Sequence, residues 1–168
     1  MKSPSFGTFT IPTRCRSSLN HTPRTDKSII KAMSLDRFCK AQEKTYADAL
    51  AELKAGRKRG HWIWWVFPQM RGLGTSEYST FYGIVDEAEA KAYLQHPVLG
   101  ARYHECVAVV HRHLCQGRVD PLTLMGSEVD VMKLRSSLGL FVKASGKDEN
   151  FLEFRTQAQA ILPLLPNR

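Results

Sequence analysis

All three tryptophans of the chain fall within four consecutive positions, in the segment Gly60–Gln69 (GHWIWWVFPQ). A basic triplet, Arg57–Arg59, precedes this segment, and a glycine-rich turn follows it. Large aromatic side chains dominate the cores in which they pack, and such residues are normally spread around a core instead of placed side by side. The segment therefore predicts one of two arrangements: an anchor for the fold or the wall of a pocket.

The length and composition of the chain indicate a single domain that needs no disulfide. A compact body of 168 residues buries about 65–70% of the surface that its unfolded chain exposes. The cysteines form no C-x-x-C pair and are far apart, at Cys15, Cys39, Cys106 and Cys115. No stretch approaches the length of a membrane span or resembles a secretory signal. We expect a soluble, cytoplasmic protein that binds no membrane.

The net charge of +8 is unevenly distributed along the chain. Residues 1–31 carry six Lys/Arg and one Asp/Glu, and residues 32–168 carry 18 and 15, so the second part has a net charge of only +3. Electrostatic binding of DNA needs a clustered basic face. Nucleic acid is therefore a weak candidate partner, although Arg57–Arg59 keeps a regulatory nucleic-acid-binding module among the alternatives.

Residues 1–32 differ in composition from the rest of the chain. They contain ten Ser/Thr and three prolines, almost no acid and no apolar periodicity. We predict a disordered extension here and an all-helical domain over residues 33–168. The extension resembles an organellar transit peptide, or it results from a start codon assigned upstream of Met33, the interpretation that we favour. A genuine transit peptide would place the protein in an organelle.

The spacing of apolar residues predicts an all-α fold of about six helices. No two-residue alternation typical of strands occurs anywhere. Ser34 is a candidate N-cap and Gly56 a stop for the first helix, and the segment 61–67 is expected to form a short buried helix. Residues 71–85 suggest a turn and an irregular or short helical piece. The expected helices cover residues 34–56, 61–67, 86–95, 97–117, 127–143 and 151–162.

The tryptophan segment holds the first group of candidate site residues. His61 lies beside Arg57 and Arg59, and because an imidazole changes charge near neutral pH, His61 is our candidate catalytic base. The alternative is that His61 caps or hydrogen-bonds within the fold. Trp62 and Trp64 form either core or a stacking wall for a ligand ring. The amide of Gln69 either reads a ligand or ties down the turn.

A second candidate group lies near the end of the chain. On a helix, Asp130, Lys133 and Ser137 share a face, and Lys133, Arg135, Ser136 and Ser137 offer the cations and hydroxyls that bind phosphate or carboxylate. We predict that these four residues bind an anionic ligand together with Arg57, Arg59, Trp62, Trp64 and Gln69. The alternative is an exposed Asp130–Lys133 pair with no ligand.

The sequence shows no motif for a metal or a cofactor. His111 and His113 are two positions apart on an expected helix, where such residues point to different faces, so they are a poor metal pair. No phosphate loop, dinucleotide fingerprint or nucleophile elbow occurs. We expect neither a metal nor a cofactor.

Three separated motifs resemble a known family. The first runs from Leu35-x-x-Phe38-x-x-Ala41-Gln42 through Gly56-Arg57-Lys58-Arg59-x-His61-Trp62-x-Trp64-x-Val66-Phe67-Pro68-Gln69. The second includes His96-Pro97-Val98-Leu99-Gly100-x-Arg102, and the third is Lys133-x-Arg135-Ser136-Ser137-Leu138-x-Leu140-Phe141. Over about residues 34–145 the chain resembles the bacterial domain-of-unknown-function family eighteen-ten, often mislabelled "calpastatin". The resemblance implies a small all-helical fold and brings no established activity.

These observations rank three functions. The first is a binding or catalytic site for a phosphate-bearing, nucleotide-like small molecule, built from the two groups of candidate residues. The second is a structural or protein-interaction domain without catalysis, in which the tryptophans are all core. The third is the weak nucleic-acid-binding module. The ligand, the reaction and the oligomeric state do not follow from the sequence.

Overall fold

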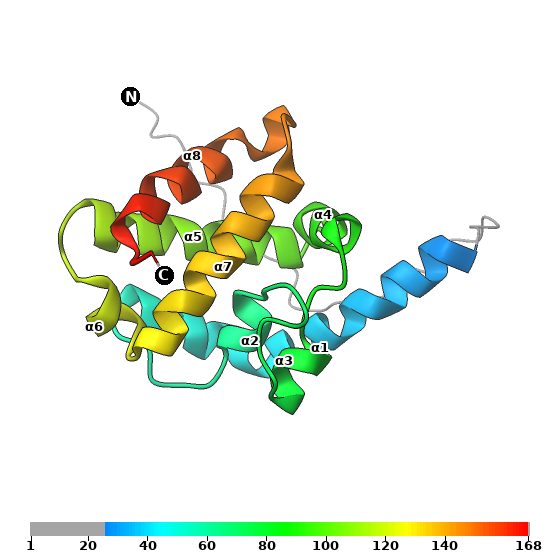
Figure 1. The fold of residues 1–168 in the computed structure, drawn as a ribbon, viewed down its shortest axis with the longest axis horizontal. Coiled ribbons are helices and arrows are strands. Elements are labelled where there is room, and N and C mark those ends of the chain that lie inside the picture. The colour runs from blue at the N-terminus through cyan, green and yellow to red at the C-terminus, as the bar shows by residue number, and fades with distance from the viewer. Residues whose placement is uncertain (1–25, 168) are drawn as a thin grey trace, which may run out of the picture.

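The computed structural model describes residues 26–167, with side chains from Leu35 onward. In this part of the chain all regular elements are helical, apart from one isolated β-bridge between Met70 and Ile84. The predicted all-α fold is confirmed (Figure 1). The helices are α1 (Asp26–Lys54), α2 (Ile63–Val66), α3 (Glu77–Phe81), α4 (Glu87–Gln95), α5 (Leu99–Cys115), α6 (Pro121–Met125), α7 (Glu128–Ser145) and α8 (Leu152–Ile161), with 3-10 turns η1 (Glu149–Phe151) and η2 (Leu162–Leu164).

Helix boundaries follow from local capping chemistry. The carboxylate of Asp86 accepts a hydrogen bond from the backbone N–H of Glu89 and so begins α4. The hydroxyl of Ser127 accepts from the N–H of Asp130 and begins α7. Both caps satisfy amides that have no partner within the helix. Gly56 has a φ of +75°, a conformation that glycine adopts at low cost, and it follows the end of α1 as predicted.

The first helix is longer at its N-terminal end than the sequence predicted. It begins at Asp26 and not after Ser34, because residues 26–34 contain no proline or glycine that would end a helix. The disordered extension that we predicted for residues 1–32 lies, for residues 1–25, outside the described residues. The domain boundary at residue 33 stays a prediction.

Within residues 26–167 the structure has two more α-helices than the six predicted, and both are short. Helix α3 occupies the stretch expected to be irregular or briefly helical. Helix α6 lies between the helices expected at 97–117 and 127–143. Asp120 caps it, Pro121 occupies its first turn, and Gly126 ends it with a φ of +79°. These three signals are all present in the sequence and identify a one-turn helix.

The core is an aromatic cluster centred on Tyr103 of α5. Its ring centroid lies 4.5 Å from Phe141 of α7, 5.6 Å from Phe154 of α8 and 5.5 Å from Phe67. All four rings are at most 1% exposed. Phe67 directly follows α2, so the tryptophan segment is fixed to the centre of the molecule at its C-terminal end.

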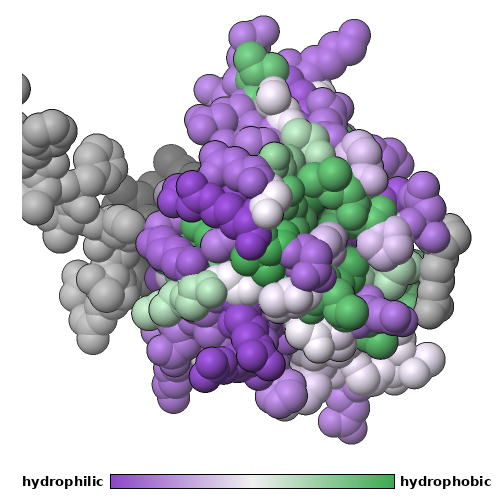
Figure 2. All heavy atoms as spheres, turned by 90° about the vertical axis from the view of Figure 1, so that its left-hand side faces the viewer, coloured by the Kyte–Doolittle hydropathy of each residue, from purple (hydrophilic) through white to green (hydrophobic). Residues whose placement is uncertain are grey.

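One face of the molecule carries an apolar patch surrounded by polar residues. Helix α6, the start of α7 and the C-terminal η2 lie on the left of Figure 1, and Figure 2 looks onto this side, where apolar residues gather. In these elements Leu122 is 49%, Val129 61% and Leu164 47% exposed. An exposed patch of this kind is typical of surfaces that contact a partner.

Candidate functional site

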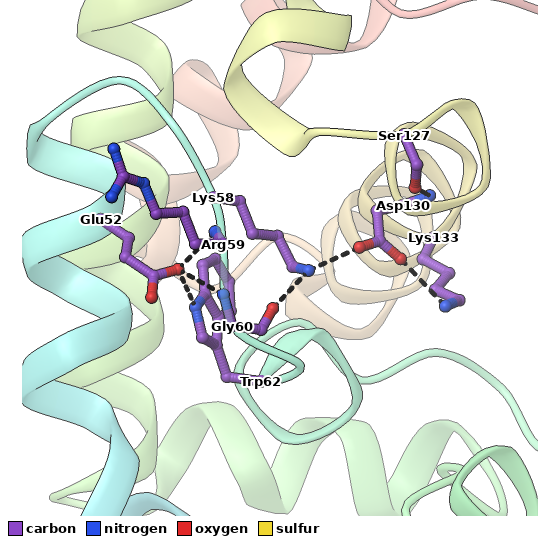
Figure 3. A network of polar contacts seen from close by, with 8 residues as sticks. All are labelled: Glu52, Lys58, Arg59, Gly60, Trp62, Ser127, Asp130 and Lys133. Carbon is purple, nitrogen blue, oxygen red and sulfur yellow. Dashed lines mark hydrogen bonds and ion pairs between the residues drawn. The ribbon is translucent and has the colours of Figure 1, made fainter.

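The loop before the tryptophans is held by the carboxylate of Glu52 on α1. Glu52 Oε2 accepts hydrogen bonds from the backbone N–H of Arg59 at 2.7 Å, the N–H of Gly60 at 2.9 Å and the indole Nε1 of Trp62 at 2.7 Å (Figure 3). Burial raises the pKa of Glu52, but these three hydrogen bonds and the charge of Lys58 outweigh burial and lower it. Glu52 therefore stays ionised and fixes where the segment begins.

A second carboxylate joins this loop to α7. Asp130 Oδ2 lies 2.6 Å from Lys58 Nζ, and Asp130 Oδ1 lies 3.0 Å from Lys133 Nζ (Figure 3). Lys58 Nζ also donates to the carbonyl of Gly60 at 2.7 Å. Burial raises the pKa of Asp130, whereas the hydrogen bonds and charges of the two lysines lower it more. Lys58 also feels the charge of Glu52, so the two lysines and the two carboxylates of this network together carry no net charge.

The Asp130–Lys133 pair is not the exposed surface pair that was one of the sequence alternatives. The side chains of Lys58, Asp130 and Lys133 are only 6%, 14% and 14% exposed. Water screens buried charges poorly, so these interactions are stronger than those of a surface pair. The basic triplet is thereby split: Lys58 points inward, and only Arg57 and Arg59 are exposed.

Lys133 borders a small surface hollow. Its Nζ lies 3.7 Å from the ring centroid of Trp64, a cation–π contact. The empty volume of the hollow is about 200 Å³, which includes space open to solvent. The lining residues come from α2 and the residue that follows it, from the segment 69–84, which includes α3, and from α7. They are Ile63, Trp64, Phe67, Gln69, Ser79, Tyr82, Gly83 and Lys133. Three predicted site residues, Trp64, Gln69 and Lys133, are thus brought together.

Gln69 contributes to the hollow through its side chain and to the fold through its backbone. Its carbonyl accepts a hydrogen bond from the N–H of Ile84 at 2.9 Å, and the N–H of Arg71 donates to the carbonyl of Ile84 at 2.8 Å. These backbone bonds tie the two ends of the segment 69–84 together. The side chain is 9% exposed, and its amide forms no hydrogen bond with any described residue. The amide is therefore available to a ligand.

The other predicted residues of the tryptophan segment do not line the hollow. His61, Arg57 and Arg59 are exposed on the loop before α2. Trp62 is 3% exposed, and its indole N–H is bound to Glu52, so this ring has the core role of the two alternatives. The catalytic role predicted for His61 stays a prediction without a neighbouring group that supports it.

Neighbours of Lys133 on α7 point elsewhere. Arg135 Nη1 donates to the carbonyls of Leu162 at 2.7 Å and Leu165 at 3.0 Å, where it fastens the C-terminal turn. Ser137 is fully buried, and its hydroxyl lies 3.0 Å from that of Tyr103. Ser136 is half-buried and does not line the hollow. Of the four α7 residues that were expected to bind an anion together, only Lys133 lies at the hollow.

Sequence reasoning missed Ser79, Tyr82 and Gly83, which lie in the segment expected to be irregular. Gly83 is required by packing, since a Cβ there would lie 2.6 Å from the carbonyl oxygen of Ser79 and 2.7 Å from the Cα of Arg71. Burial raises the pKa of Tyr82, so its hydroxyl stays protonated. In the sequence, the spacing of the aromatic residues within 78–82 was the one indication that this segment packs against the tryptophans.

Two kinds of feature are absent from the described residues, a metal-binding cluster and a membrane-spanning helix. No group of three or more His, Cys, Asp or Glu side chains within residues 35–167 is arranged to hold a metal ion. None of the helices described has the length and apolarity that crossing a bilayer demands.

Comparison with known proteins places the chain in a family. No curated protein matches it. The crystal structure of the conserved hypothetical protein Rv1873 from Mycobacterium tuberculosis is similar, with 43% sequence identity, a TM-score of 0.67 and coverage of 79% of this chain and 86% of that chain. The family model described as "Protein of unknown function (DUF1810)" matches residues 32–158. The chain therefore belongs to the DUF1810 family, the family whose motifs the sequence resembles.

Proposed function

We propose that the hollow beside Lys133 binds the phosphate of a small, nucleotide-like molecule. The observation that carries this proposal is the place of the Lys133 ammonium, which lies on the ring of Trp64 in the same hollow as the unpartnered amide of Gln69. An ammonium and an amide N–H are the donors that an anionic oxygen needs.

The local charge supports an anion as the ligand. Lys133 shares its ion-pair partner Asp130 with Lys58, so its ammonium has only part of one carboxylate as a counter-ion. A phosphate beside this ammonium would interact with it where water screens charge little. A cationic ligand would be repelled by the ammonium of Lys133.

The size of the hollow indicates how such a ligand would lie. Sites that enclose a whole ligand usually have about 300–1,000 Å³. The hollow encloses no space for even a water molecule, so a ligand group would rest against its open side. The ring of Tyr78 is 57% exposed and nearly parallel to that of Trp64, with 15° between planes and 6.5 Å between centroids. We infer that the phosphate lies on the open side of the hollow, against Lys133, while a planar base stacks on Tyr78.

The proposal is for binding and includes no chemical step. A general base has to reach the reacting proton directly or through one water. His61 does not line the hollow, and of the side chains that do, Lys133 alone carries a charge. The arrangement therefore supports recognition of the ligand.

Thermal unfolding in the presence of ligands tests this proposal. AMP, ADP-ribose and a sugar phosphate are added at fixed ionic strength to the wild type, Lys133→Met and Lys143→Met. Lys143 lies on the same helix, is 76% exposed and pairs with the exposed Glu87, so it is a matched control. We expect a saturable rise of the unfolding midpoint in the wild type and in Lys143→Met, and its loss in Lys133→Met. No rise with any compound would refute the proposal.

A protein-interaction role is the second candidate, and the apolar face of Figure 2 favours it. The exposure of Leu122, Val129 and Leu164 gives this face the apolar character that contact surfaces require. Self-association measured by sedimentation would be weakened by Val129→Asp if copies of the chain meet there. A protein that stays monomeric at all concentrations would contradict self-association through this face.

A further inference from the structure

A second polar cluster lies where α1 packs against the start of α5. Gln42, on the buried face of α1, is only 1% exposed. Its Nε2 donates to the backbone oxygen of Trp65 at 2.7 Å and to the hydroxyl of Tyr93 at 2.9 Å. Because these bonds use both amide hydrogens, they fix the orientation of the amide. Gln42 Oε1 is thereby directed toward Arg102.

Arg102 is a half-buried guanidinium that lacks a full set of acceptors. Its Nη1 lies 3.4 Å from Gln42 Oε1, longer than the roughly 2.7–3.2 Å of an ordinary N–H···O hydrogen bond. Its Nε is buried and has no hydrogen-bond partner among the described residues. The guanidinium carbon lies 4.7 Å from the ring centroid of Tyr46, so the ring supports the guanidinium in one plane.

No carboxylate in the described part of the chain forms an ion pair with Arg102. The nearest candidate in sequence, Glu105, lies one turn further along α5, but it accepts from the hydroxyl of Tyr46 at 2.6 Å and pairs with Lys54 at 3.5 Å. The other Lys and Arg side chains that are at least half-buried each have an oxygen acceptor at 3.0 Å or closer, namely Arg37, Lys58, Lys133, Arg135 and Arg155. Arg102 is the exception among them.

The position of Arg102 makes this lack of a counter-ion costly. It lies in the first turn of α5, the end of the helix dipole that favours anions and not cations. A buried N–H without an acceptor costs about 1–3 kcal/mol by itself. Both costs disappear if an anion occupies the site.

His96 lies near Arg102, and its own contacts fix its ring. Its Nδ1 accepts from the backbone N–H groups of Val98 at 3.3 Å and Leu99 at 3.2 Å, so Nε2 carries the hydrogen. Burial lowers the pKa of His96, exposed Asp36 raises it, and the charge of Arg102 lowers it. The ring is half-buried, and its Nε2 lies 3.9 Å from the sulfur of Cys39.

We propose that Arg102 forms an oxyanion site, separate from the hollow at Lys133, that binds a carboxylate or a phosphate. The planar guanidinium, supported by Tyr46 and Gln42, offers two parallel N–H groups that match the oxygens of such an anion. The site does not depend on the function proposed above, because the two clusters have no residue in common. It also gives a role to the motif His96-Pro97-Val98-Leu99-Gly100-x-Arg102, which the hollow does not use.

Titration of inorganic phosphate and of acetate into the full chain at fixed ionic strength tests this site. The readouts are the NMR signal of the Arg102 Nε–H group and the midpoint of thermal unfolding. The variants are Arg102→Gln, Arg102→Lys and Lys133→Met, with Arg112→Gln as the control because Arg112 is exposed on the same helix. Arg102→Lys keeps the charge without the planar fork, so it keeps the fold testable if Arg102→Gln unfolds.

We expect a saturable shift of the Arg102 signal with at least one anion, retained in Lys133→Met and in Arg112→Gln. Affinity should fall about tenfold to a hundredfold in Arg102→Gln and less in Arg102→Lys. The anion that binds more tightly identifies the natural ligand as a carboxylate or a phosphate. Shifts of the Arg102 signal that do not saturate, or a rise of the unfolding midpoint that is the same in Arg102→Gln, overturn the proposal. Binding lost only in Lys133→Met also overturns it, while supporting the hollow.

Discussion

Glu52 anchors the tryptophan segment, and removing its carboxylate should test this role most clearly. Its Oε2 alone accepts three hydrogen bonds, from Arg59, Gly60 and Trp62, at 2.7–2.9 Å. A hydrogen bond to a charged group contributes about 1.5–3 kcal/mol, and an unsatisfied buried donor costs about 1–3 kcal/mol. Arg59 is exposed and water replaces its bond, so most of the effect comes from the buried Trp62 indole.

We therefore expect Glu52→Ala to lower the free energy of unfolding by about 3 kcal/mol, and Glu52→Gln by about 1–1.5 kcal/mol, because an amide oxygen still accepts but carries no charge. Urea unfolding followed by circular dichroism and by tryptophan fluorescence measures both. Glu43→Gln is the control, since Glu43 is exposed on the same helix. A loss of less than about 0.5 kcal/mol in Glu52→Ala, the range of ordinary surface substitutions, would refute the anchoring role.

The dependence of this effect on pH gives an independent check. Because the folded-state pKa of Glu52 is lowered below its ordinary value, its stabilisation is present above that ordinary value and is lost as the pH falls through the folded pKa. The difference in stability between the wild type and Glu52→Gln should therefore shrink in acid. A difference that stays constant down to the acid transition would mean that the charge has no part in the anchoring.

Three further predictions follow from packing and burial. Gly100→Ala should lower the free energy of unfolding by about 3 kcal/mol, because its Cβ would lie 2.0 Å from the carbonyl oxygen of Leu94. Gly139→Ala on α7 should raise it by up to about 1 kcal/mol, since the new Cβ meets nothing within 4 Å; a destabilised Gly139→Ala would contradict the packing described. Burial lowers the pKa of His104, and Glu153 opposes this, so the fold favours the neutral ring. Stability should fall as the pH drops from the ordinary histidine pKa toward the folded one, and His104→Gln should flatten that part of the unfolding profile.

Local signals in the sequence were sufficient for most of the fold. The acidic start of α4 and the cap at Ser127 act within one turn, so their helices were correctly predicted. The apolar segment 61–67 was also correctly expected to be a short buried helix, which the structure places at Ile63–Val66. The predicted start of α1 was wrong because a cap residue was taken as a boundary, although nothing between Asp26 and Ser34 breaks a helix.

The site was harder to predict because its contacts are non-local. Lys58 and Asp130 are far apart in the sequence, and nothing near either residue indicates their ion pair. The separation of Arg135 from Lys133 follows from their spacing, since residues two positions apart on a helix point to different faces. The contributions of Ser79 and Tyr82 depend on how the segment 69–84 closes on itself, which periodicity does not describe.

The central claim is that Lys133 binds the phosphate of a small ligand, and calorimetric titration of AMP into the wild type and Lys133→Met tests it most directly. In the variant the methionine still covers Trp64 and Asp130 keeps Lys58 as its partner, so the fold should be retained. We predict saturable one-to-one binding to the wild type that weakens at least about tenfold in the variant, as expected for the loss of a charged hydrogen bond. Equal affinity in the two proteins, or no binding to the wild type, would contradict the claim.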